Sequence, residues 1–183
     1  SRTGNILTGT WLLDEAQTRI LAILAGTQAD MAHLEQARLA DQLAVAAVKY
    51  ALLKSNLGTN IAFSFDDSLS FTGNSGPYLE YTYVRCHSIL QKAARQSKNR
   101  SITKLIDILL NSKSYSDEAI DSTERDVLLY LSYYSDAVKL AAQEYAPHHL
   151  CTYLFGLGQR FSRFYEACPI LTKTTTTFSP LQV

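Results

Sequence analysis

The sequence predicts an all-α protein, a bundle of helices, and three observations support that prediction. Apolar residues recur at the 3.6-residue period of a helix along most of the 183 residues. Short polar breaks containing Gly, Pro, Asn, Asp or Ser separate these periodic segments. Only Ile61–Phe65 alternates in the manner of a strand, which predicts at most a short extended segment there.

The first part of the chain carries two helical patterns. From Trp11 to about Gln36 we expect one long or two shorter helices, with a break at Gly26 or Asp30. A second pattern covers residues 41–55. The residues expected to face a core are Leu12, Ala16, Ile20, Ile23 and Leu24 in the first pattern, and Leu43, Ala46, Ala47, Tyr50 and Leu53 in the second.

The next polar segment contains Asp66, Asp67 and Ser68, which invites comparison with a carboxylate metal site. A hard cation needs more oxygen ligands than these, and no third ligand at a suitable spacing lies nearby. We interpret the segment as a helix cap or a turn.

The stretch Phe71–Ala94 begins with a turn and continues as a helix. Pro77 suits the first helical position, because its missing N–H would be unpaired there and its φ is already helical. One apolar stripe is expected to face a core and comprises Leu79, Tyr83, Cys86, Leu90 and Ala93. A second stripe, offset by about 100° around the axis, comprises Tyr78, Tyr81, Arg85, Ser88, Lys92 and Arg95.

Two interpretations of the second stripe stay open. Aromatic residues followed by cations along one ridge suit a surface that stacks on bases and follows phosphates. Ordinary packing with a solvated basic end explains the same pattern, and the spacing alone favours this plainer interpretation.

The second half of the chain predicts four more helices. An amphipathic pattern covers Ile102–Leu110, and Asp121 with Glu124 resembles a capping box that begins the next helix. A third helix restarts at Ser135, with an inner stripe of Val138, Ala141, Ala142 and Tyr145, and ends before Pro147. The last helix, 147–168, has an apolar face of Leu150, Leu154, Leu157, Phe161, Phe164 and Cys168 and a second face of Tyr153, Gly156, Arg160 and Arg163.

Composition excludes several classes of protein. With 46% apolar and 19% charged residues the chain can bury a core, and it has no apolar run long enough for a membrane helix. Its three cysteines lie within helical patterns, which favours reduced thiols and a cytoplasmic location. The net charge is zero, yet residues 91–113 hold six cations and one acid. The chain starts without Met and ends on a Thr-rich segment, so we expect a fragment of a longer protein.

Metal binding is not expected. His148, His149 and Cys151 are close in sequence, but adjacent histidines point apart on a helix, so only His148 and Cys151 share a face. Two ligands do not make a zinc site.

Three blocks of the chain resemble class I arginyl-tRNA synthetases, in that family's order and at about its spacing. Ser1–Ala16 is similar to the family's degenerate Ser-x-Arg-x-Gly-Asn-x-x-Thr loop followed by Leu-Leu-Asp-Glu-Ala. Gly73–Arg85 matches Gly-x-x-Gly-Pro-Tyr-Leu-x-Tyr-x-x-x-Arg, with Glu80 where the family usually has Gln. Pro147–Pro169 is similar to the block that contains Tyr-Leu, Phe-Tyr and Cys-Pro pairs.

This resemblance implies the C-terminal part of such an enzyme. Residues 1–71 would be the end of the catalytic domain and residues 72–183 an all-helical anticodon-binding bundle. The parent would be an arginine–tRNA ligase of protein synthesis that activates arginine with ATP and Mg and transfers it to tRNA. Since the nucleotide-binding half lies outside the sequence, we expect the fragment alone to be inactive and to bind no cofactor.

The resemblance and the stripes together suggest site residues and partners. The family's ATP-phosphate loop would correspond, in degenerate form, to Ser1, Arg2, Gly4 and Asn5. The residues expected to bind arginine tRNA are Tyr78, Tyr81, Arg85, Lys92, Arg95, Tyr153, Arg160 and Arg163. Arginine and ATP would be substrates of the parent, and we expect a monomer.

A helical protein-interaction module that has lost RNA binding is the alternative. The Thr-rich tail stands where the family usually has a further long helix, which motivates this hypothesis. The charge along the aromatic ridges distinguishes the two functions: an RNA binder keeps a cationic track, whereas a protein-binding face replaces it with apolar residues. This sequence keeps the cations.

Overall fold

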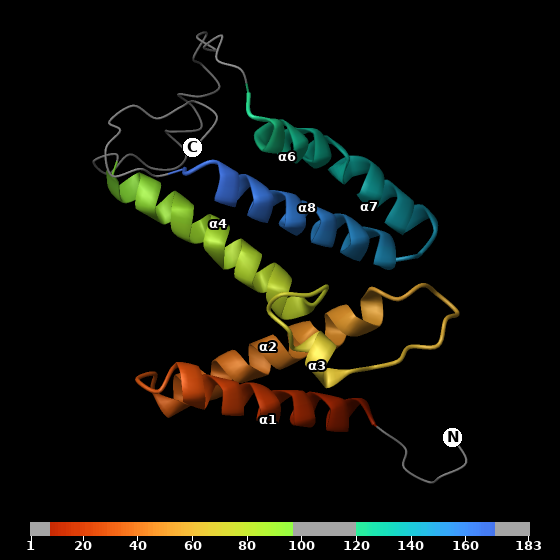
Figure 1. Ribbon diagram of the computed structural model, residues 1–183. Helices are drawn as coiled ribbons and strands as arrows, with labels where there is room; N and C mark the ends of the chain where they lie inside the picture. Colours follow the sequence, from red (N-terminus) through yellow and green to blue (C-terminus); the bar gives the residue numbers. More distant parts are fainter. Residues whose placement is uncertain (1–7, 97–119, 171–183) are drawn as a thin grey trace. The chain divides into compact units, whose positions relative to one another are not determined.

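The computed structural model describes residues 8–96 and 120–170, and Figure 1 shows their helices. The helices are α1 (Gly9–Thr27), α2 (His33–Leu53), α3 (Phe65–Ser68), α4 (Gly76–Gln96), α6 (Ser122–Ser132), α7 (Tyr134–Gln143) and α8 (His148–Ala167). Neither range contains a strand, so the all-α prediction is confirmed for them. The predicted helix at 102–110 lies outside the described residues, as do Ser1, Arg2, Gly4 and Asn5.

The chain divides into two compact units. Unit 1 comprises Ser1–Tyr81 and Asp136–Phe155, and unit 2 comprises Thr82–Ser135 and Gly156–Val183. The unit boundaries fall inside α4, α7 and α8, so each of these helices contributes residues to both units. The predicted domains, 1–71 and 72–183, stay a prediction, because compactness does not reveal which segment belongs to a catalytic domain.

The core of unit 1 lies between α1 and α2, which run side by side in Figure 1. Small residues on α2 let the two helices approach closely, and the larger side chains of α1 fill the contact. The buried cluster consists of Ala16, Ile20, Leu24, Ala40, Ala44, Ala47, Val48 and Leu69. Most of the predicted stripes therefore face this core, but Ile23 is 42% exposed and its predicted burial is wrong.

The predicted limits of α2 are also wrong. The break after α1 falls at residues 28–32, close to the expected position, but α2 then begins at His33 and includes the segment predicted as a separate helix from Asp41. Its N-cap residue, Ala32, makes no side-chain hydrogen bond, so no capping residue in the sequence marks this start. Gln36 ties the break to α2 by donating from Nε2 to the Gln28 carbonyl at 2.7 Å.

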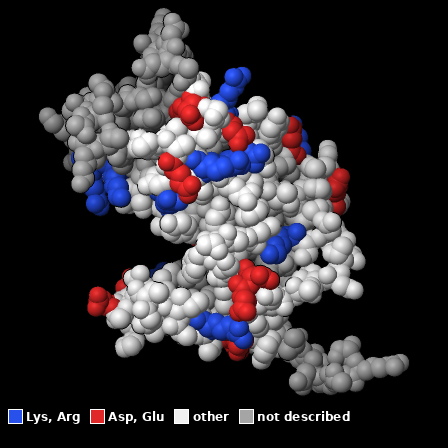
Figure 2. Space-filling view, in the orientation of Figure 1, with Lys and Arg blue, Asp and Glu red and all other residues white. Residues whose placement is uncertain are grey.

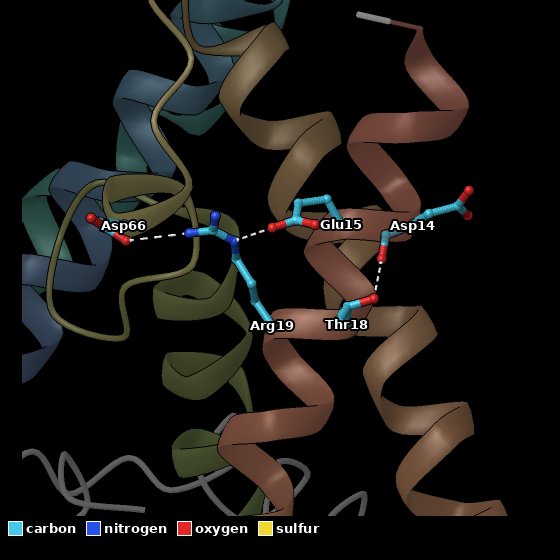
Figure 3. A network of polar contacts seen from close by, with 5 residues as sticks. All are labelled: Asp14, Glu15, Thr18, Arg19 and Asp66. Carbon is cyan, nitrogen blue, oxygen red and sulfur yellow. Dashed lines mark hydrogen bonds and ion pairs between the residues drawn. The ribbon is translucent and has the colours of Figure 1, made fainter.

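Arg19 links α1 to α3 within unit 1 (Figure 3). Its guanidinium contacts Glu15 at 2.8 Å and Asp66 at 3.8 Å, and it lies 4.5 Å from the centre of the Phe65 ring. Ser64 caps α3 by accepting from the Asp67 N–H, and the two aspartates occupy the first turn of the helix. The capping interpretation of this segment is confirmed, and no cluster of three potential metal ligands occurs in the described ranges. Residues 61–64 form no strand.

Unit 2 contains α6, most of α4 and the second half of α8. Asp121 begins α6 as predicted: its carboxylate accepts hydrogen bonds from the Thr123 hydroxyl and from the Thr123 N–H, the latter at 2.7 Å. These bonds lower the pKa of the Asp121 carboxyl. Glu124 Oε1 is buried and has no hydrogen-bond partner among the described residues, so that atom does not complete the predicted capping box.

The helix α7 ends in a left-handed residue. Tyr145 has φ +52°, and the Ala146 N–H donates to the Ala141 carbonyl at 2.9 Å, as in a Schellman motif. Tyr145, Ala142 and Val138 were predicted to face inward, but Tyr145 is 86% exposed, and Ala142 and Val138 are exposed as well. That part of the prediction is wrong, because the helix stops before Tyr145 and α7 buries no residue completely.

No helix in the described ranges has both the length and the apolar character that crossing a membrane requires.

Candidate nucleic-acid interface

The start of α4 is fixed by its own sequence. Ser75 is buried and accepts a hydrogen bond from the Tyr78 N–H at 3.2 Å, while its hydroxyl donates to the Ser70 carbonyl. This bond caps the helix immediately before Gly76 and Pro77. A Cβ on Gly76 would lie 2.6 Å from the Ala46 carbonyl oxygen, so α4 begins directly against the backbone of α2. The turn predicted from the sequence before α4 is therefore closely packed against α2 within unit 1.

A hydrogen-bond network around Tyr50 holds the same turn. The Tyr50 hydroxyl lies 2.6 Å from Asn74 Oδ1 and 3.2 Å from the Cys151 carbonyl oxygen. Lys54 donates from Nζ to the Asn74 carbonyl at 2.7 Å. Burial, with a smaller effect of Cys151, raises the pKa of Tyr50 well above its ordinary value, so the phenol keeps its proton. Tyr50 of α2 and Lys54, the residue that follows this helix, thus position the turn that leads into α4.

The exposed face of α4 differs from the prediction. Tyr83 was expected to face a core, yet it is 70% exposed, and Val84 and Leu90 are exposed as well. Of the predicted core stripe, only Ala93 is buried. The buried side of α4 is therefore rotated away from that stripe, and its exposed residues are Tyr81, Tyr83, Val84, His87, Leu90, Gln91, Lys92 and Arg95.

The predicted tRNA-binding residues at the start of this helix lie in different surroundings. Tyr78 is half-buried and meets the Phe155 ring edge-on, with centroids 5.6 Å apart. Tyr81 is 50% exposed. Arg85 is half-buried, and its guanidinium lies 4.1 Å from the centre of the Tyr165 ring. Tyr81 therefore presents the most surface for a base, whereas Tyr78 and Arg85 also take part in packing.

The cations at the end of α4 are exposed. Lys92 and Arg95 lie in its last turns, and Glu80 is the only acidic residue of the helix. Figure 2 shows Lys and Arg side chains as separate groups on a mostly uncharged face, with Asp and Glu groups among them. Cations at a helix C-terminus also interact favourably with the helix dipole, which is a purely structural role.

The predicted residues on α8 fall into three classes. Tyr153 is only 5% exposed, so its ring packs in unit 1 and offers no face to a base. Arg160 is half-buried: its Nε lies 3.2 Å from Asp126 Oδ1, its Nη1 donates to the Gly156 carbonyl at 3.1 Å, and its guanidinium lies 3.8 Å from the centre of the Tyr130 ring. Arg163 is exposed. Only Arg163 is fully available to a phosphate.

Sequence reasoning missed the rings that hold these arginines. Tyr165 lies beneath Arg85, and Tyr130 lies beneath Arg160. In each pair the two residues lie on different helices: Arg85 on α4 and Tyr165 on α8, Arg160 on α8 and Tyr130 on α6. Helical spacing reports which residues share a face of one helix, so it carries no signal for such pairs between helices.

Glu80 occupies a position where its charge is costly. Its side chain is half-buried, and Oε2 is shielded from solvent without a hydrogen-bond partner in the described part of the chain. Burial raises the pKa of this carboxyl above its ordinary value. The folded protein therefore holds the proton more tightly than the unfolded chain does.

From this shift we expect Glu80→Gln to be more stable than the original chain at neutral pH. Protonated Glu80 stabilises the fold, and that contribution is present below the ordinary glutamate pKa of about 4.3 and is lost as the pH rises through the raised value. Thermal melting at pH 7 should show a higher Tm for Glu80→Gln, and melting at pH 4 should show no difference. An equal or lower Tm at pH 7 would contradict the assignment.

Among the described residues of these two helices, α4 carries exposed aromatic rings and exposed cations, and α8 carries one exposed cation, Arg163. Rings can stack on unpaired bases, and cations can contact phosphates without regard to sequence. No cluster of three potential metal ligands occurs in the part of the chain that the structure describes. These exposed rings and cations are side chains that suit the binding of a nucleic acid.

Comparison with known proteins gives a consistent result. Residues 79–178 match the family model of the DALR anticodon binding domain. The chain is 36% identical over 171 residues to an arginine–tRNA ligase of Aliivibrio salmonicida and 34% identical to one of Vibrio campbellii. Each alignment covers 93% of this chain and 27% of the relative, so the chain spans about a quarter of the length of these relatives.

Solved structures show the same relationship. The arginyl-tRNA synthetase of Thermus thermophilus superposes with a TM-score of 0.75 at 26% identity, over 98% of this chain and 28% of that one. The arginyl-tRNA synthetase of Plasmodium falciparum superposes with a TM-score of 0.65 at 22% identity, over 91% and 28% of the two chains, and supports the fold alone.

Proposed function

The chain belongs to the DALR anticodon-binding domain family and corresponds to the C-terminal part of arginyl-tRNA synthetases, and from that premise we propose that it binds the anticodon arm of arginine tRNA. The observation that carries the proposal is the exposed face of α4, where Tyr81 is followed by Lys92 and Arg95. An aromatic ring can stack on an unpaired base, and the cations can contact phosphates of the same strand.

The proposed interface is smaller than the one predicted from the sequence. Tyr81, Lys92, Arg95 and Arg163 are its direct contacts, because these side chains are exposed. Tyr78, Arg85 and Arg160 take part in packing and position their helices, and Tyr153 is buried.

Catalysis belongs to the parent protein in this proposal. Activation of arginine with ATP and Mg and its transfer to tRNA would require the three quarters of the relatives' length that this chain does not cover. ATP and arginine would therefore be substrates of the parent, which we place in the cytoplasm as a monomer. The role of this chain would be to hold the tRNA while that reaction proceeds.

The test is a titration of the 183-residue chain with arginine tRNA at several salt concentrations. If four or five phosphates are neutralised, the logarithm of affinity should fall against the logarithm of salt with a slope of about −3 to −5. Lys92→Ala should flatten the slope by about one and weaken all tRNAs alike. Tyr81→Ala should weaken binding by about 1–3 kcal/mol without changing the slope.

Lys49→Ala, which removes an exposed cation from α2, is the matched control. It should leave the affinity for tRNA and the salt slope unchanged. Salt-independent binding would show that phosphates are not contacted. If the chain binds no tRNA, the proposal fails and the alternative of a protein-interaction module becomes the better explanation. A Tyr81→Ala chain that unfolds before it loses RNA would place that ring in the core.

A further inference from the structure

The outward side of α6 is apolar. Leu128 and Leu131 are each 46% exposed and Leu129 is 55% exposed, although all three are large apolar side chains. Asp126 and Tyr130 face α8, because both contact the same arginine of that helix. With about 100° between successive residues, Leu128 points about 160–200° away from that side, and Leu129 and Leu131 flank it. We call these three leucines the leucine face, and they belong to unit 2.

The C-terminal segment of the chain is attached beside the start of this helix. α8 ends at Ala167, and Cys168 Sγ lies 3.8 Å from the Thr123 hydroxyl oxygen in the first turn of α6. Residues 171–183 follow and lie outside the described part of the chain. The point from which they extend is therefore next to α6, on the side that faces α8.

The length of this segment suits a path to the leucine face. Half the circumference of a helix about 10–12 Å wide is about 16–19 Å, and Thr123 and Leu128 are about 7.5 Å apart along the axis, so the path measures about 18–20 Å. Seven residues lead from Leu171 to Phe178, and seven extended residues span up to about 23–25 Å. Phe178 can therefore reach the leucine face, and Leu181 follows it.

The chemistry of the segment matches the order of side chains on α6. Glu124 lies one turn before Leu128 on the same side, and its Oε1 is buried without a hydrogen-bond partner among the described residues. A buried acceptor of this kind needs a donor. Residues 172–177 supply one ammonium group and five hydroxyl groups, and the apolar residues come after them. Residues 174–183 carry no charged side chain, so placing them on an apolar surface desolvates no charge.

We propose that the leucine face of α6 is a docking surface for the C-terminal segment of this same chain, with Phe178 and Leu181 packed on the leucines. The Thr-rich stretch crosses the start of α6 and donates to Glu124. Burying these apolar side chains against one another is the driving force. The inference does not rest on the proposed RNA binding.

The experiment measures how fast trypsin cuts the 183-residue chain after Lys173. The released peptide, 174–183, is quantified by mass spectrometry, and its rate of release follows the fraction of molecules in which the segment is undocked. Phe178→Ala removes the ring from the segment, and Thr176→Ala is the control there. Leu128→Gln removes a contact from α6, and Leu90→Gln, at an exposed leucine of α4, is its matched control.

If the segment is docked, Phe178→Ala and Leu128→Gln should each raise the cleavage rate about 3- to 10-fold, while both control variants stay within about twofold of the original chain. The two changes combined should act about as strongly as the more effective one alone, because they remove the same contact. The rates should not depend on protein concentration, since the segment docks within its own chain.

Three results would overturn the proposal. Cleavage of Phe178→Ala within about twofold of the original chain would show that the segment is not docked, and would leave the leucine face to residues 97–119 or to another protein. Acceleration by Leu90→Gln but not by Leu128→Gln would place the segment on α4. Protection that grows with protein concentration would place it on a second copy of the chain. Phe178→Ala changes no described helix, so its result decides even if Leu128→Gln fails to fold.

Discussion

Gly76→Ala should destabilise the protein by about 3 kcal/mol or more, the largest loss expected from any single change considered. The added Cβ would lie 2.6 Å from the Ala46 carbonyl oxygen and 2.8 Å from its carbon. Both are backbone atoms of α2, which cannot move aside like the end of a flexible side chain. Either α4 separates from α2 or the hydrogen bonds of α2 distort, and both outcomes cost stability.

Gly73→Ala is the matched control, because the nearest atom to its Cβ would be Ser70 Oγ at 3.7 Å, an ordinary contact. Thermal melting and urea unfolding should show Gly76→Ala far below the original chain and Gly73→Ala close to it. Alanine is the better helix former by about 1 kcal/mol, so the clash must outweigh that gain. A Gly76→Ala protein as stable as the original chain would show that α4 does not start against α2 as described.

The second large effect should come from Arg160. Its guanidinium contacts a carboxylate, a backbone carbonyl and the face of a tyrosine ring within unit 2. We expect Arg160→Ala to lower the free energy of unfolding by about 1–3 kcal/mol, because the change removes packing as well as charge. Arg160→Lys should recover only part of this loss, since an ammonium cannot reproduce the planar fork.

Arg163→Ala provides the control on the same helix. Its side chain is exposed, so the expected change in stability is within about 0.5 kcal/mol. In the tRNA titration, by contrast, Arg163→Ala should have the larger effect of the two variants. It should flatten the dependence of affinity on salt while the fold stays intact. If Arg160→Ala melts like the original chain, the network seen around it contributes nothing, and a direct role on RNA becomes the better explanation.

Much of the fold could be predicted from local patterns. Pro77 marked the start of α4, Asp121 capped α6, and the periodic stripes located α1 and α8. The start of α2 could not be predicted, because its N-cap residue, Ala32, has no polar side chain that could cap the helix. Tyr145 continued the apolar period of α7 although the helix had already ended. Periodicity predicts that a helix exists better than it predicts where the helix stops.

The candidate site was harder to predict for a different reason. Spacing placed Tyr83 in the core, yet the burial of an aromatic side chain depends on which neighbouring helix covers it. Spacing also grouped Arg85 and Arg160 with the RNA contacts, although each lies over a tyrosine ring in the folded chain. Tyr81, Lys92 and Arg95 were predicted as RNA contacts and are exposed, and their role stays a prediction.

The Tyr50 hydroxyl has one hydrogen atom and two oxygen atoms in front of it. Asn74 Oδ1 at 2.6 Å and the Cys151 carbonyl at 3.2 Å therefore compete for a single proton, and the shorter contact receives it most of the time. If the turn before α4 moves away, the hydroxyl can rotate and donate to the Cys151 carbonyl of α8 instead, so the phenol keeps its proton and one hydrogen bond. Losing one of the two acceptors should therefore cost less than losing both.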